Sequence, residues 1–139
     1  MNPNIEASLN RADELLSDLR AEYSRALGTK TVTARASLLT HEVVERLRST
    51  LDLSARRYWE AHVAGALAPE DRTAASVYFP IAADENGFDS ILGRWRWRSV
   101  RDQHGAVYDY LRSLQPFVGR GNSWLGVMNS LAVAGKHID

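Results

Sequence analysis

The stretch that decides the fold is residues 5–26, IEASLNRADELLSDLRAEYSRA. Apolar and small side chains recur in it at alternating steps of four and three residues, at Ile5, Leu9, Ala12, Leu16, Leu19, Tyr23 and Ala26. This spacing predicts one long amphipathic helix whose apolar stripe faces the core and whose charged residues lie opposite. Either Asn2 followed by Pro3, or Asn4 itself, supplies the start signal of this helix, and Gly28 supplies the stop.

A second stripe with helical spacing begins near Thr33 and runs to the breakers Gly65 and Pro69. Its members are Leu39, Val43, Val44, Leu47, Leu51, Ala55, Tyr58 and His62. Two long helices joined by only a few residues are expected to pack as an antiparallel hairpin. A third helix is predicted from a capping box at Ser99 to Pro116, and a last one from Asn122 or Ser123 onward.

Between Ala68 and Arg98 the helical period is lost, and residues 77–81 read as an extended segment interrupted by Pro80. The predicted fold is therefore all-α: a four-helix bundle with a long antiparallel helical hairpin and one irregular crossover at 68–98. A chain of 139 residues is the usual size of one domain, so we expect a single helical-bundle domain at 1–139.

Composition excludes several classes of function. The 17 basic and 17 acidic residues cancel, so no general attraction to nucleic acid or anionic membranes is expected. The absence of cysteine excludes disulfides, thiolate zinc sites and a cysteine nucleophile. His41 and Glu45 share a helix face, but two ligands do not make a metal site, and we expect neither metal nor cofactor. Without a signal-peptide pattern, and with the longest uncharged run too short to span a bilayer, a cytoplasmic protein is expected.

The predicted last helix, Asn122 to Gly135, carries no charge and is apolar nearly all round. Such a helix requires burial on several sides. Either a partner covers it, or the chain is the N-terminal part of a longer protein. We therefore favour a non-enzymatic interaction or scaffold module that forms a homo-oligomer through this helix.

Two sets of residues on the second helix are candidates for catalysis. Arg48 lies at the edge of the apolar stripe, and Asp52, one turn further on, is the nearest carboxylate. Arg57 and His62 resemble the Arg-x4-His motif of the helical ribonucleases called HEPN domains. However, a separation of five residues turns them about 140° apart on a regular helix, with His62 toward the core. His62 is then equally well explained as a hydrogen-bonded histidine at the core edge.

Interleaved arginine and tryptophan form the strongest local charge patch, at Arg94, Trp95, Arg96, Trp97 and Arg98. Guanidinium groups for phosphate and indoles for base stacking are typical of a platform for single-stranded nucleic acid. The alternative is that Trp97 opens the apolar seam of the next helix. RNA is therefore the alternative partner, and the alternative function is a metal-independent ribonuclease or RNA-binding bundle.

The order of several short motifs resembles a widespread family of uncharacterised bacterial and phage proteins. The motifs are Leu47-Arg48-Ser49-Thr50-Leu51-Asp52, Phe79-Pro80-Ile81, Gln115-Pro116-Phe117, Trp124-Leu125 and Lys136-His137. The resemblance covers Leu47 to the end of the chain and implies a shared polar cluster in which Arg48 and Asp52 face Lys136 and His137. His137 thereby joins Arg48, Asp52 and His62 as a candidate catalytic residue. Where the family pattern has Asn and Asp before Lys-His, this chain has Ala132, Val133 and Gly135.

Overall fold

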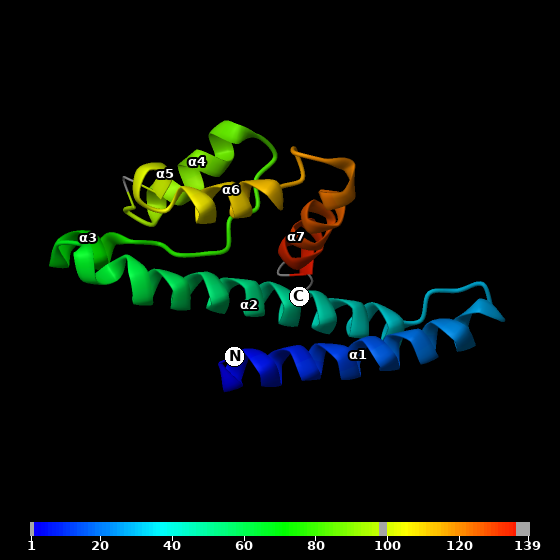
Figure 1. The fold of residues 1–139 in the computed structure, drawn as a ribbon. Helices are drawn as coiled ribbons and strands as arrows, with labels where there is room; N and C mark the ends of the chain where they lie inside the picture. Colours follow the sequence, from blue (N-terminus) through cyan, green and yellow to red (C-terminus); the bar gives the residue numbers. More distant parts are fainter. Residues whose placement is uncertain (1, 98–99, 136–139) are drawn as a thin grey trace. The chain divides into compact units, whose positions relative to one another are not determined.

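The computed structural model describes residues 2–97 and 100–135, and this part of the chain contains helices and no strand. The α-helices are α1 (Pro3–Leu27), α2 (Ala34–His62), α3 (Pro69–Ala74), α4 (Glu85–Arg94), α5 (Val100–Gln103), α6 (Gly105–Ser113) and α7 (Ser123–Gly135) (Figure 1). Short 3₁₀ turns occur at Ala64–Ala66 and Arg120–Asn122. The predicted all-α class is confirmed.

The chain divides into two compact units. Unit 1 contains α1, the part of α2 up to Thr50, and the part of α7 from Asn129 onward. Unit 2 runs from Leu51 to Met128.

Unit 1 is built on the predicted antiparallel hairpin, in which α1 and the first half of α2 lie side by side (Figure 1). Leu15 of α1 forms a buried cluster with Leu39 and Val43 of α2. The Ser8 hydroxyl is 2.7 Å from the Thr50 hydroxyl near the other end of the pair. As the residue number rises along α1, the number of the contacted residue falls along α2, so the two helices are antiparallel.

A buried carboxylate fixes the turn of the hairpin. Glu22 is buried, although a glutamate is seldom found so unless it is paired. Its carboxylate accepts a hydrogen bond from the Thr33 hydroxyl at 2.7 Å and forms an ion pair with Arg25 at 2.7 Å. Thr33 in turn accepts from the backbone N–H of Ala36 at 3.0 Å, so this contact also caps the start of α2.

The apolar stripe predicted for α1 is only partly used within the chain. The residues that α1 buries are Ala12, Leu15, Glu22 and Ala26. Leu9 and Tyr23, both expected in the core, are exposed. The prediction was wrong for these two because the buried face is rotated from the centre of the stripe toward Leu15 and Glu22.

Unit 2 packs its helices around buried aromatic rings. Trp59 of α2 donates its indole N–H to the backbone oxygen of Trp95 at 2.8 Å, and Trp95 donates its own to the oxygen of Tyr78 at 3.1 Å. Phe88 of α4 is fully buried and packs edge-on against Tyr108 of α6, with ring centroids 5.4 Å apart. These contacts tie α2, the extended residues 75–84, α4 and α6 into one core.

The crossover predicted at 68–98 is not wholly irregular, because α3 and α4 lie within it. Helix α4 begins where the Asp84 side chain accepts from the backbone N–H of Gly87 at 2.8 Å, and it buries Phe88 and Leu92 one turn apart. Two glycines in ten residues weaken its helical signal in the sequence. Residues 75–82, which include the predicted extended segment 77–81, have no regular secondary structure.

The predicted third helix is divided in two. Helix α5 ends at Gln103 and α6 begins at Gly105, because His104 between them has non-helical dihedrals, φ −139° and ψ 46°. The predicted cap, Ser99, lies outside the described residues. The last helix begins at Ser123, as predicted.

Candidate functional site

Helix α7 has one buried side and one exposed side. Leu125, Met128 and Ala132 are buried. The exposed apolar side chains of this helix are Trp124, Val127, Leu131 and Val133. Among the described residues α7 is therefore buried on one side only, and the exposed set leaves large apolar side chains in contact with solvent. Trp124 is 56% exposed and Val127 is 59% exposed.

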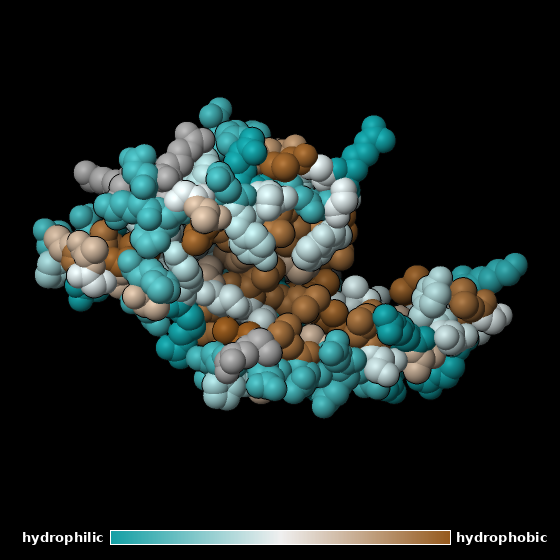
Figure 2. Space-filling view, viewed as in Figure 1, coloured by the Kyte–Doolittle hydropathy of each residue, from teal (hydrophilic) through white to brown (hydrophobic). Residues whose placement is uncertain are grey.

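An apolar groove lies in unit 1 beside the end of α7. Its volume is about 810 Å³, and its walls come from α1, α2 and Leu131. Leu16, Leu19 and Tyr23 of α1 supply the apolar wall, while His41 lies on the α2 side. Apolar side chains gather along this part of the hairpin in the space-filling view (Figure 2). Contiguous apolar surface of this kind is typical of interaction sites.

The candidates Arg48 and Asp52 each have a defined partner. Arg48 is half-buried, as expected for the edge of the stripe, and its guanidinium donates to the side-chain oxygen of Asn129 at 2.8 Å. Asp52 accepts from the backbone N–H of Phe79 at 2.8 Å, which anchors the extended segment to α2 within unit 2. Lys136 and His137, the other members of the predicted polar cluster, lie outside the described residues.

His62 is exposed at the end of α2, so its predicted core-side position is wrong. Its ring lies 4.6 Å from that of Tyr58, centroid to centroid. The Tyr58 hydroxyl lies 3.4 Å from Nδ1 of His104, and burial raises the pKa of Tyr58. Arg57 is exposed and its guanidinium pairs with Glu60 at 3.4 Å. The Arg57 contact is thus a surface ion pair, which is worth little in stability.

The structure brings His62, Arg96 and Trp97 together around a pocket of about 250 Å³ in unit 2. Arg96 has a positive φ of 59°, a conformation that is uncommon outside glycine. The pocket also contains Asp71. Histidine, arginine and aspartate at one small cavity could bind an anion or move a proton, although no described hydrogen bond links them.

The predicted base-stacking platform is wrong in its central feature. Trp95 is 1% exposed and Trp97 is 6% exposed, and their ring planes are parallel with centroids 6.3 Å apart. Indoles that fill the core of unit 2 do not offer a face to a nucleotide base. Arg94 and Arg96 are exposed, whereas Arg98 lies outside the described residues.

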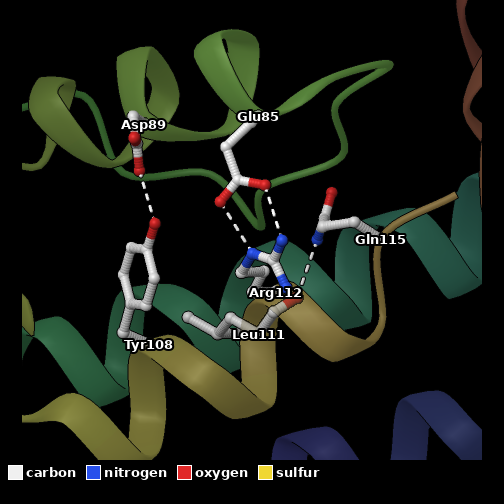
Figure 3. Close-up of polar contacts among 6 residues, drawn as sticks. All are labelled: Glu85, Asp89, Tyr108, Leu111, Arg112 and Gln115. Atoms are coloured by element: carbon white, nitrogen blue, oxygen red, sulfur yellow. Dashed lines mark hydrogen bonds and ion pairs between the residues drawn. The ribbon is translucent and has the colours of Figure 1, made fainter. Parts of the chain in front are cut away.

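Sequence reasoning missed a polar network that joins α4 to α6 (Figure 3). Arg112 donates two hydrogen bonds to the Glu85 carboxylate, from Nε to Oε1 and from Nη2 to Oε2, each at 2.7 Å. This pairing raises the pKa of Arg112. Tyr108 donates to Asp89 at 2.7 Å. Pairs between residues 19 and 27 positions apart leave no signal in local spacing. The network ties α4 to α6 within unit 2.

Comparisons of the chain with family models, with curated proteins and with solved structures find no match. Among the described residues, no helix has both the length and the apolar character needed to cross a membrane. The same part of the chain contains no group of three or more His, Cys, Asp or Glu side chains suited to hold a metal ion.

Proposed function

We propose that this chain is a non-enzymatic helical interaction module that self-associates through the exposed apolar side of α7. The observation that carries the proposal is the exposure of Trp124, Val127 and Leu131, which lie within about 60° of one another around one helix. No charged residue occurs from Gly121 to Gly135, so no charge in this helix has to lose its hydration when the helix enters an interface.

The groove supports the same proposal. Leu131 belongs both to the exposed side of α7 and to the lining of the groove in unit 1. A second copy that covers Leu131 would therefore also cover apolar surface of α1. Burial of apolar surface contributes about 25 cal/mol per Å², which makes such continuous surface the main source of association energy.

We expect a Val127→Glu variant to weaken self-association at least about tenfold, because a carboxylate would lose its hydration in an apolar interface without gaining a partner. Sedimentation velocity over a range of concentrations measures the change. Tyr110→Glu is the matched control, because Tyr110 is also an exposed apolar residue on a helix but lies on α6. A wild-type chain that stays monomeric at its highest soluble concentration would contradict the proposal.

A second candidate function is binding or cleavage of RNA at the pocket of His62 and Arg96. The supporting observation is that these two cationic or titratable side chains, far apart in the sequence, line one cavity. If this function is correct, single-stranded RNA is cleaved in the presence of a chelator, and His62→Ala abolishes the cleavage. His41→Ala is the control, because His41 lies in unit 1. Absence of cleavage together with absence of salt-sensitive binding would reject this candidate.

A further inference from the structure

Helix α1 presents to solvent a stripe that is nearly symmetric about its own centre. Its members are Ile5, Leu9, Asp13, Leu16, Arg20, Tyr23 and Leu27. Leu9, Tyr23 and Leu27 are exposed, and Ile5 and Leu16 are half-buried. Most of this stripe lies outside the hairpin core, because α1 buries a different set of residues against α2, although half-buried Leu16 also packs against that core.

The apolar positions are symmetric about Leu16. Ile5 and Leu27 lie eleven residues before and after it, and Leu9 and Tyr23 lie seven residues before and after it. Consider two identical helices that pack antiparallel across a two-fold axis. A residue that lies n positions before the axis on one copy then contacts the residue that lies n positions after the axis on the other copy. An axis at Leu16 therefore places apolar side chains opposite apolar side chains along the whole of α1.

The two charged members of the stripe are complementary under the same operation. Asp13 lies three residues before Leu16 and Arg20 lies four after it. The offset of one residue corresponds to about 1.5 Å along the helix, which these side chains can span. Each two-fold pair would thus contain two Asp13–Arg20 ion pairs.

Neither Asp13 nor Arg20 has an ion-pair partner among the described residues. Other charges on α1 are already satisfied within the chain: Arg11 pairs with Glu14 at 2.9 Å, and Arg25 pairs with Glu22 at 2.7 Å. Glu6 and Asp18 of α1 likewise have no ion-pair partner among the described residues, but of these charges only Asp13 and Arg20 lie within the symmetric apolar stripe. Their opposite charges, at nearly equal distances from Leu16, make this surface complementary to itself.

We infer that the partner at this surface is a second copy of the chain, packed with α1 antiparallel to α1 across a two-fold axis at Leu16. The inference rests on the proposed self-association and specifies how the α1 helices of the two copies are aligned. Leu16 and Leu131 line the same groove of unit 1, so the end of α7 borders the interface. An interface of this symmetry closes after two copies and forms a dimer, not a filament.

Charge reversal at the two positions tests the register. Asp13→Arg places two arginines opposite each other, and Arg20→Asp places two aspartates opposite each other. Each variant alone should dimerise at least about tenfold more weakly than the wild type, because like charges are juxtaposed twice in every dimer. An equimolar mixture of the two variants should restore association, since the mixed pair contains Arg opposite Asp at both sites. Sedimentation velocity of each variant and of the mixture measures this.

Asp18→Arg is the matched control. Asp18 is an exposed acid on the same helix, but two residues turn it about 200° from Leu16, onto the opposite side. It should leave dimerisation unchanged. If the wild type dimerises but neither reversal weakens it, or if the mixture associates no better than its components, the register is wrong while the proposed function stands. If the wild type is monomeric, both proposals fail.

Discussion

Replacing Trp95 by alanine is expected to lower the free energy of unfolding of unit 2 by about 3–5 kcal/mol, the range for removing a large aromatic side chain from a core. Trp95 is 1% exposed and its ring lies parallel to that of Trp97. Its removal would leave a cavity and would also deprive the Tyr78 carbonyl oxygen of the indole N–H that lies 3.1 Å away. Urea unfolding monitored by circular dichroism measures the loss.

Two further variants separate these contributions. Trp95→Phe keeps much of the buried volume but loses the indole N–H, so it should be destabilised less than Trp95→Ala. Trp124→Ala removes the same side chain from an exposed site and should change stability by under about 1 kcal/mol, provided that the chain is monomeric in the assay. Equal effects of Trp95→Ala and Trp124→Ala would show that the Trp95 ring is not in the core.

Replacing Gln115 by leucine is expected to destabilise unit 2 by about 3 kcal/mol, because buried backbone groups would lose their partners. Gln115 is fully buried. Its amide oxygen accepts from the N–H of Ala82 at 2.9 Å, and its amide nitrogen donates to the oxygens of Pro80 and Leu111, each at 2.9 Å. A leucine of similar volume satisfies none of these groups. Chemical denaturation measures the difference, and Gln103→Leu at an exposed site is the control.

The Gln115→Glu variant gives this prediction a pH signature. A carboxylate still accepts from Ala82 but cannot donate to either carbonyl oxygen, and burial raises its pKa above the usual value of about 4.3. A group whose pKa is raised by folding stabilises the protein below its unfolded pKa, and that contribution is lost as the pH rises. The variant should therefore fall further below the wild type as the pH increases from about 4 toward 7. A deficit independent of pH would contradict the buried position of this side chain.

The helical content and the hairpin could be predicted because they depend on local periodicity. The four-and-three spacing from Ile5 to Ala26 matches a helix over its whole length, and the short connection around Gly28 leaves an antiparallel neighbour as the simplest packing. Helix α4 was missed for the same reason. Gly87 and Gly93 lower its helical propensity, so its formation depends on packing Phe88 and Leu92 into the core of unit 2.

The candidate sites show the corresponding limit. Alternating arginine and tryptophan at 94–97 fits both an exposed platform and a buried seam, and only the tertiary structure decided that the indoles of Trp95 and Trp97 are buried. His62 follows the stripe of α2 in the sequence, but it lies at the last residue of the helix, where the chain turns away and leaves its ring exposed.

The sequence by itself determined that the chain is all-α, where its long helices run, and that α7 carries no charge, because these properties depend on residues within a few turns of one another. The tertiary structure decided which side of each stripe is used. A helix with a broad apolar stripe can bury either edge of it, and the choice is made by partners distant in the sequence. For α1 these are Leu39 and Val43, which cover Leu15 and leave Leu9 and Tyr23 to solvent.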